Sequence, residues 1–290
     1  MGVSVREEAV TSQRVALVIG AGAIKCAAAI GVYDVLEQEG IGIDLVVGCS
    51  GGSLYAAYAA LGCSADEAAQ TTRELWTREL TARRNRRAVF QVAFPKLFGF
   101  SDRFGLIDDR LIRRRLEDAY GERTFADAKV PLFIVATDFH SGEKVVLSEG
   151  LLRDAIRGSI AIPFVFSPSP FGERLLTDGS LSDPMPVDVA IRENADVILA
   201  LGFDQPYQRS IDGMARFAFQ VTTVMTNNLM RSNFAFHNLA HHAEVITLVP
   251  EFDDSVRAFD TDKLPLIIEK GREAMRGNLP YLRRLLERAG

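Results

Sequence analysis

One serine in the sequence stands where its hydroxyl could act as a nucleophile. The pentapeptide Gly48-Cys49-Ser50-Gly51-Gly52 matches the pattern Gly-x-Ser-x-Gly, with an apolar run before it and an alanine-rich run after it. A strand that turns sharply into a helix at this pattern strains the backbone at the serine, and the flanking glycines have no Cβ to clash. The first amides of the helix then favour negative charge beside the exposed hydroxyl. We therefore predict that Ser50 is a nucleophile; a glycine-rich turn that binds nothing, or binds phosphate, is the simpler alternative.

A serine hydroxyl is a weak nucleophile unless a base removes its proton, and Asp178 is the favoured candidate for that base. Residues 175–177 form a short apolar run that we interpret as a strand, and Asp178-Gly179-Ser180 follows it directly. A carboxylate at the carboxyl end of that strand is expected at the same sheet edge as Ser50. Burial would raise its pKa above the value of about 4 of a free aspartate, which makes direct proton transfer from serine workable.

Histidine is the alternative base. The sequence holds 4 histidines, and Ser50, Asp178 and either His237 or His241 satisfy the chain order serine, acid, histidine of α/β-hydrolase triads. These histidines fall inside a long predicted helix rather than on a loop after a strand, so the triad ranks second. His237 and His241 also have the i, i+4 spacing of a metal site, but no carboxylate motif accompanies them, and we expect no metal.

The elements that must position these residues alternate along the chain. Short apolar runs predict strands at residues 15–19, 45–47, 132–137, 145–147, 175–177, 197–201 and 245–249. Longer runs with helical periodicity predict helices at residues 25–39, 52–61, 65–80, 108–119, 151–158, 212–242 and 264–288. This alternation predicts an α/β fold with a mostly parallel sheet flanked by helices. Residues 138–148 indicate an antiparallel hairpin that turns at Ser141-Gly142.

Several further segments, in the same order, give the chain a resemblance to the patatin-like phospholipase family. Residues 16–41 resemble the opening strand, glycine-rich loop and first helix of the family. Residues 130–150 resemble its central strand and hairpin, and residues 155–168 resemble the segment before its aspartate. The resemblance implies a three-layer patatin-like α/β fold and a catalytic Ser–Asp dyad, here Ser50 and Asp178, with no catalytic histidine and no cofactor.

The resemblance also implies an oxyanion loop, where the family typically has Gly-Gly-Gly-x-Arg/Lys-Gly. The aligned residues here are Ala21, Gly22, Ala23, Ile24, Lys25 and Cys26. Amides around residues 21–24 and at Gly51 would hold the oxyanion, and Lys25 would orient the loop or attract a lipid phosphate. Ala21, Ala23 and Cys26 replace three family glycines, and a positive φ at such a position would cost about 1–2 kcal/mol. A catalytically impaired descendant that binds acyl chains or a membrane surface is therefore the second functional hypothesis.

Composition and charge narrow the classes of partner and compartment. The net charge of −5 gives no general attraction to nucleic acid. Three cysteines without framework spacing predict free thiols and a cytoplasmic protein. We find no signal peptide, and no run of the roughly 18 to 20 apolar residues that a membrane span needs. A dinucleotide site at Gly20-x-Gly22 is disfavoured, because Lys25 stands where the third glycine is needed.

Residues 81–105 could bring the protein to a membrane surface. In this segment Arg83, Arg84, Arg86 and Arg87 precede Phe90, Phe94, Phe98, Phe100 and Phe104. Basic residues suit anionic headgroups, and spaced aromatic rings suit the membrane interface. The alternative is a solvated basic turn followed by phenylalanines in the core. The long run at residues 212–242 would pack on the core or form the contact of a homodimer.

The combined expectation is a lipid acyl hydrolase of the phospholipase, lysophospholipase or esterase type. Residues 15–200 would form its patatin-like catalytic core, and residues 201–290 a helical and strand extension that packs on the same domain. The substrate would be a lipid or another acyl ester, and the reaction would pass through an acyl-enzyme on Ser50.

Overall fold

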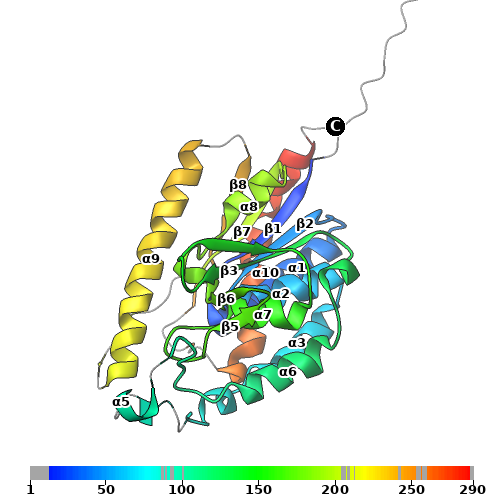
Figure 1. Cartoon of the computed structure of the whole chain (residues 1–290). Helices are drawn as coiled ribbons and strands as arrows, with labels where there is room; N and C mark the ends of the chain where they lie inside the picture. The colour runs from blue at the N-terminus through cyan, green and yellow to red at the C-terminus, as the bar shows by residue number, and fades with distance from the viewer. Residues whose placement is uncertain are drawn as a thin grey trace, which may run out of the picture.

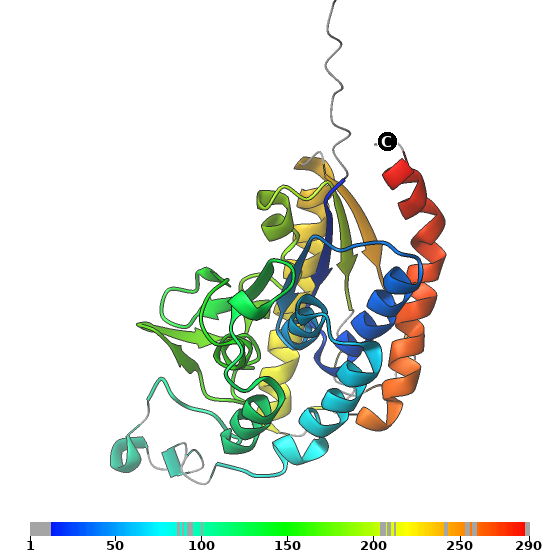
Figure 2. The same ribbon diagram turned by 90° about the vertical axis from the view of Figure 1, so that its right-hand side faces the viewer.

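Helices and strands form three layers in the part of the chain that the structure describes. This structure is a computed structural model, and it describes residues 13–85, 88, 90–91, 95–99, 101–203, 207, 210–211, 213–240, 243–252, 256 and 260–287. Within these ranges one mixed sheet lies between two sets of helices (Figures 1 and 2).

The half of the sheet that carries the serine turn is parallel. Its strands are β1 (Val15–Ile19), β2 (Leu45–Cys49), β3 (Leu132–Asp138), β7 (Val197–Leu201) and β8 (Glu244–Leu248). They lie in the order β3-β2-β1-β7-β8, and each neighbouring pair is parallel. β1, β2 and β7 are buried along their whole length, which explains why they appear in the sequence as continuous apolar runs.

The other end of the sheet is antiparallel. β4 (Lys144–Leu147) pairs with β3 and forms the predicted hairpin, and Gly142 in its turn has a φ of 75°. β6 (Arg174–Thr177) pairs with the end of β3 and with β5 (Ser169–Phe171). The order of the whole sheet is β5-β6-β3-β2-β1-β7-β8, with β4 beside β3. The sequence does not predict β5, because three residues are too few for an alternation signal.

Helices from both halves of the chain cover one face of the sheet. The side chains of Val15, Leu17 and Ile19 in β1 belong to a large apolar core on this face. The helices that share this core are α1 (Ala28–Gln38), α2 (Gly51–Leu61), α3 (Ala65–Leu75), α6 (Arg110–Tyr120), α7 (Leu152–Ser159) and α10 (Leu264–Glu287). α1 and α10 touch through glycine: a Cβ on Gly271 would lie 1.9 Å from the carbonyl oxygen of Ala28.

The opposite face of the sheet is covered by α8 (Val187–Arg192) and by α9 (Met214–Ala240). Ala16 and Val18 of β1 belong to the smaller core on this side. Figure 1 shows α9 as a long helix that runs along this side of the molecule, away from α10. Alternate residues of one strand therefore serve two cores, and the predicted three-layer α/β fold is confirmed.

Most predicted elements lie within a few residues of observed ones, and the differences concern short elements. The first predicted helix is divided into a 3₁₀ turn η1 (Ala23–Ala27) and α1, and the third is α3 followed by η2 (Arg78–Thr81). The elements that the sequence does not predict, besides β5, are α5 (Pro95–Phe98), η3 (Phe125–Asp127), η4 (Gly179–Leu181), α8 and η5 (Thr261–Lys263). Elements of three to six residues contain too little periodicity to be recognised.

Candidate active site

Ser50 lies at the turn that joins β2 to α2. Its backbone has φ 51° and ψ −128°, a conformation that L-residues adopt only under strain. The glycines around it are required by space. A Cβ on Gly48 would lie 2.6 Å from the Cβ of Ala56, and one on Gly52 would lie 2.2 Å from the carbonyl oxygen of Ile19. The predicted strained turn from strand to helix is therefore present, with Ser50 at its apex.

The hydroxyl of Ser50 donates a hydrogen bond to Oδ2 of Asp178 at 2.7 Å. Asp178 is only 1% exposed, and its other oxygen, Oδ1, accepts from the backbone N–H of Ser180 at 2.9 Å. Burial raises the pKa of Asp178, although the hydrogen bonds from Ser180 and Ser50 oppose this shift. The structure thus joins the two residues that the sequence singles out and gives the carboxylate the raised basicity that proton transfer needs.

The strand that brings Asp178 to Ser50 is antiparallel to its neighbour. The sequence predicted only that this strand ends at the same sheet edge as Ser50, and β6 does so while running antiparallel to β3. Thr177 pairs with Thr137, so β6 enters from beyond the carboxyl end of β3 and ends at that edge. Thr137 then donates its hydroxyl hydrogen to the carbonyl oxygen of Asp178 at 2.8 Å. The expected proximity of Ser50 and Asp178 is present, whereas the direction of β6 could not be predicted, because a run of three residues contains no signal of direction.

Gly179 and Gly51 allow two turns to pack closely against neighbouring backbone. Gly179 lies in the turn at residues 178–180, which we call the dyad turn, and Gly51 lies in the serine turn. A Cβ on Gly179 would lie 2.2 Å from the carbonyl oxygen of Val135 and 2.9 Å from Sγ of Cys49. A Cβ on Gly51 would lie 2.6 Å from the carbonyl oxygen of Ala23. Gly51 is therefore in direct contact with the first residue of η1, which places the first turn of α2 beside the expected oxyanion loop.

In the expected oxyanion loop, only some of the amides remain candidates. The N–H of Ala21 donates to the carbonyl oxygen of Pro184 at 2.9 Å, and the N–H of Lys25 donates to that of Gly22 at 3.1 Å. This narrows the expected donors from the run 21–24 to Gly22, Ala23 and Ile24, together with Gly51 at the start of α2. The first amides of a helix have no partner within the helix, which is why such positions can serve an anion.

Ala23 has a φ of 50°, so one of the three replaced family glycines does fall at a left-handed position. The loop adopts this conformation with alanine at the expense of about 1–2 kcal/mol. Cys26 is fully buried, and its thiol donates to the carbonyl oxygen of Gly20 at 3.2 Å. Lys25 lies with its ammonium 5.4 Å from the ring centre of Phe252. The side chains that replace the family glycines therefore pack within and around the loop.

Cys49, the neighbour of the serine, is a packing residue. It is fully buried in the smaller core, and burial raises the pKa of its thiol well above the ordinary value. A thiol with such a pKa is protonated and a poor nucleophile at neutral pH. Cys49 therefore fills space beside Ser50 rather than reacting.

Ser159, at the end of α7, supports the serine turn, and sequence analysis missed it. The backbone N–H of Ser50 donates to Oγ of Ser159 at 2.9 Å, and this hydroxyl donates to the carbonyl oxygen of Val135 at 2.6 Å. Ser159 is fully buried. Its only signal in the sequence is its position within the segment 155–168, which resembles the family but contains no obvious polar motif.

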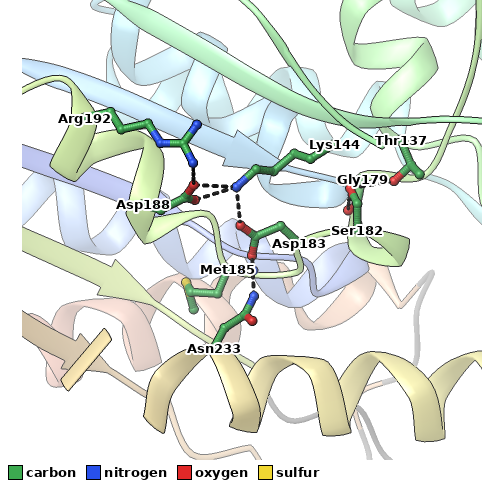
Figure 3. Close-up of polar contacts among 9 residues, drawn as sticks. All are labelled: Thr137, Lys144, Gly179, Ser182, Asp183, Met185, Asp188, Arg192 and Asn233. Atoms are coloured by element: carbon green, nitrogen blue, oxygen red, sulfur yellow. Dashed lines mark hydrogen bonds and ion pairs between the residues drawn. The ribbon is translucent and has the colours of Figure 1, made fainter. Parts of the chain in front are cut away.

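A partly buried ion network lies near Gly179, and Figure 3 shows its members. The ammonium of Lys144 in β4 lies 3.0 Å from Oδ2 of Asp183 and 2.6 Å from Oδ2 of Asp188. Burial raises the pKa of Asp183; at Asp188 burial is outweighed by Lys144, and the pKa of Asp188 is lowered. The network ties the hairpin to the segment that follows Gly179, whose carbonyl oxygen accepts from the N–H of Asp183 at 2.9 Å.

The histidines of the alternative triad cannot be placed beside the dyad. His237 belongs to α9, but its side chain lies outside the described part of the chain, as does the whole of His241. His140 is in the turn of the hairpin, where its Nε2 lies 3.7 Å from Oδ2 of Asp102 and its side chain is 64% exposed. The triad and the metal spacing of residues 237 and 241 therefore remain hypotheses from sequence.

The segment 81–105 is only partly described. Arg83, Arg84 and Phe90 are exposed, and Leu97 in α5 is 79% exposed, whereas Phe104 is half-buried. Arg86, Arg87, Phe94 and Phe100 lie outside the described residues, as does the side chain of Phe98. None of the helices in the described ranges combines the length and the apolar character that a membrane crossing needs.

A serine at a turn from strand to helix, bonded to a buried carboxylate on a three-layer α/β sheet, is an arrangement typical of serine hydrolases. The family model of patatin-like phospholipases matches residues 17–191, more than half of the sequence. The chain belongs to the patatin-like phospholipase family.

Individual relatives agree with this assignment. The chain is 32% identical over 231 residues to an uncharacterized NTE family protein of Mycobacterium tuberculosis, in a match that covers 79% of this chain and 59% of the relative. It is 30% identical over 193 residues to patatin-like phospholipase domain-containing protein 6 of Homo sapiens, covering 66% of this chain and 13% of that protein. The chain therefore corresponds to only part of the curated relatives it matches.

A solved structure shows the same fold. The crystal structure of VipD from Legionella pneumophila aligns with a TM-score of 0.51 over 93% of this chain and 67% of that one, at 12% sequence identity. At this identity the likeness concerns the arrangement of helices and strands alone.

Proposed function

We propose that this chain is a lipid acyl hydrolase that uses Ser50 as its nucleophile and Asp178 as its base. The observation that carries the proposal is the 2.7 Å hydrogen bond from the hydroxyl of Ser50 to Oδ2 of Asp178. Membership of the patatin-like phospholipase family supports the ester of a lipid as the substrate class. The dyad supplies both nucleophile and base, so this mechanism requires no metal ion.

The reaction proceeds in two halves. In the first, Asp178 accepts the proton of Ser50 as Oγ forms a bond to the ester carbonyl carbon, and the carbonyl oxygen becomes an oxyanion. The tetrahedral intermediate collapses, the bond to the leaving alcohol breaks, and Asp178 returns the proton to that alcohol. In the second half, Asp178 accepts a proton from water as the water oxygen attacks the acyl carbonyl carbon. The bond from that carbon to Oγ of Ser50 then breaks, Asp178 returns the proton to Oγ, and the carboxylic acid is released.

The developing oxyanion would be held by amides at the start of two helical segments. Gly51 belongs to α2, and Ala23 opens η1, and the two residues are in contact. An anion beside Ser50 would meet the positive end of the α2 dipole. Each such donor is worth about 10²–10³ in rate.

The second candidate function is acyl-chain binding without turnover. The observation in its favour is the φ of 50° at Ala23, where a family glycine is replaced by a residue with a Cβ. A loop held in a strained shape could place an oxyanion donor too far from the reacting carbonyl. Against this hypothesis stands the intact contact of Ser50 and Asp178.

The test is labelling of the purified chain with a fluorophosphonate probe, with the adduct mapped by mass spectrometry. We expect an adduct on Ser50 in the wild type, and none in Ser50→Ala or Asp178→Asn. Loss of labelling only with substitutions at His237 or His241 would instead support the triad. An unlabelled wild type, with a related active hydrolase labelled in parallel, would reject the proposed hydrolase and favour the binding function.

A further inference from the structure

Four apolar side chains of α9 form one exposed surface. Phe217, Val221, Val224 and Met225 are 54%, 42%, 38% and 63% exposed. Their spacing of four, three and one residues places them on one side of the helix. A surface helix normally buries such a side against the core. We refer to these four side chains as the apolar stripe.

In the middle of α9, the side that faces the protein is polar. Thr223, Thr226 and Asn227 are 4%, 6% and 4% exposed, and among the described side chains of the helix Met230 contributes to the smaller core. Over residues 217–227 the described side chains therefore place threonine and asparagine inside and the apolar stripe outside, the opposite of an ordinary amphipathic helix. An exposed apolar surface of this kind indicates a binding surface rather than a part of the core.

The charges on α9 select an anionic partner. Residues 214–240 contain Arg216 and Arg231 and no aspartate or glutamate, although the whole chain has a net charge of −5. Both arginines are exposed. A second copy of the chain, placed symmetrically on the stripe, would bring arginine against arginine with no acid of the helix to pair with them. Anionic headgroups can pair with both arginines, while the apolar side chains enter the boundary of the acyl chains.

The apolar stripe also lies on the helix that contacts the dyad turn. α9 packs against η4, which directly follows Asp178. Nδ2 of Asn233 donates to Oδ1 of Asp183 at 2.9 Å, as Figure 3 shows, and the N–H of Asp183 donates to the carbonyl oxygen of Gly179 at 2.9 Å. A lipid surface bound to α9 would therefore lie at a fixed position relative to Ser50 and Asp178.

We propose that the apolar stripe of α9, flanked by Arg216 and Arg231, docks the protein on an anionic lipid surface. This contact is distinct from the one expected at residues 81–105. Docking needs no chemistry at Ser50. The consequence that docking presents lipid esters to the dyad rests on the proposed hydrolase function.

The experiment is sedimentation of the full chain with vesicles, in a Ser50→Ala background so that no lipid is consumed. Vesicles of phosphatidylcholine with phosphatidylglycerol are compared with vesicles of phosphatidylcholine alone. We expect binding to the mixed vesicles, weakened about tenfold or more by the double substitution Phe217→Ser and Met225→Ser. Arg231→Gln should weaken binding to the anionic vesicles about fivefold and leave the neutral ones unaffected.

Two matched controls separate this surface from others. Leu266→Ser removes an apolar side chain that is 44% exposed on α10, on the opposite side of the sheet, and should leave vesicle binding unchanged. Leu97→Ser removes the 79% exposed side chain in α5, within residues 81–105. If Leu97→Ser abolishes binding and the α9 double variant does not, the proposal is overturned in favour of residues 81–105.

Two further readouts complete the test. The wild type and the α9 double variant are compared by light scattering after size exclusion. If the wild type is a dimer that the double substitution dissociates, and neither protein binds vesicles, the proposal of lipid docking is overturned in favour of a second copy of the chain. Hydrolysis of a soluble short-chain ester, measured with Ser50 intact in both proteins, should be equal, because the stripe lies outside the dyad. Vesicle binding that depends on α9 without any ester hydrolysis would uphold docking and reject the proposed hydrolase function instead.

Discussion

The backbone N–H of Ser50 donates to the hydroxyl of Ser159, at a distance of 2.9 Å and across 109 positions of the chain. The same hydroxyl donates to the carbonyl oxygen of Val135. Ser159 therefore joins the strained serine turn to the central strand β3. Because the φ of 51° at Ser50 persists only if its surroundings hold it, this bond is part of what positions the proposed nucleophile.

Ser159→Ala should destabilise the protein and impair the reaction. The substitution leaves the buried N–H of Ser50 without its acceptor, which costs about 1–3 kcal/mol. We expect a comparable decrease in the free energy of unfolding by urea titration, and a lower kcat with little change in KM. Ser53→Ala is the matched control. The hydroxyl of Ser53 donates to the carbonyl oxygen of Ser50, but that oxygen also accepts from the backbone N–H of Ser53 at 2.9 Å and keeps this second bond in the variant. Equal effects of the two substitutions would contradict the role of Ser159.

Hydrolysis should fail on the acid side at a pH above that of an ordinary aspartate. Burial raises the pKa of Asp178, and only the ionised form can accept the proton of Ser50. We therefore expect kcat/KM to fall as pH decreases through the raised pKa of Asp178. A profile of kcat/KM against pH for a soluble ester provides the measurement. Activity that stays constant down to about pH 4 would show that Asp178 has no raised pKa in the working enzyme.

Asp178→Asn should abolish activity and yet stabilise the fold at neutral pH. A group whose folded pKa is raised binds more protons when folded, so stability falls as pH rises from its unfolded pKa of about 4 through the folded value. The Asp178→Asn variant avoids this loss of stability, because an asparagine side chain does not titrate. Melting temperatures of both proteins should therefore converge at low pH and differ at pH 7, with the variant higher. A variant that melts lower than the wild type at pH 7 would contradict the raised pKa.

Ala23→Gly should stabilise the oxyanion loop. Glycine adopts the φ of 50° without the Cβ penalty, and part of this gain is lost through the greater freedom of glycine in the unfolded chain. The net gain should be up to about 1 kcal/mol by urea titration, with kcat equal or higher. Ala21→Gly is the control: its N–H remains bound to Pro184, and Ala21 is not among the residues with positive φ. It should lower stability by about 0.5–1 kcal/mol.

Lys144→Met should be among the more damaging substitutions outside the dyad. It leaves the carboxylates of Asp183 and Asp188 buried without their shared ammonium, and breaking one partner of a buried ion pair costs about 3–5 kcal/mol. Arg192→Ala is the control, because Arg192 also pairs with Asp188 but its side chain is 72% exposed, and its loss should cost less than about 1 kcal/mol. Urea titrations of both variants measure the decrease in the free energy of unfolding. Similar small decreases for the two variants would show that the network does not hold the dyad turn.

The contribution of Asp188 to stability depends on pH with a definite sign. The pKa of Asp188 is lowered because Lys144 outweighs burial, so its stabilisation is present above the unfolded pKa of about 4. It is lost as pH falls through the lowered folded value. The difference in the free energy of unfolding between the wild type and Lys144→Met should therefore become smaller in acid. The same urea titrations, carried out at low pH, would measure it.

The sequence by itself determined those features that depend on near neighbours in the chain. The apolar runs that became β1 and β7 lie at the predicted residues, because a strand covered on both faces needs apolar side chains throughout. The hairpin at Gly142 and the strained turn at Ser50 were predicted for the same kind of reason, since each needs glycine at or beside one particular backbone conformation. The pairing of Ser50 with Asp178 was predicted from two short motifs and a family resemblance, not from any physical contact visible in the sequence.

Only the tertiary structure decided the contacts between residues far apart in the chain. The antiparallel direction of β6, the bond of Ser159 to Ser50 and the network around Lys144 each join segments whose separation carries no periodic signal. The orientation of α9 is the clearest case. Its sequence has the composition of a helix that could bury either side, and the contacts of its polar side with the dyad turn leave Phe217 and Met225 outside. Such choices are made by the packing of the whole molecule, because the free energy of burial depends on which surfaces meet.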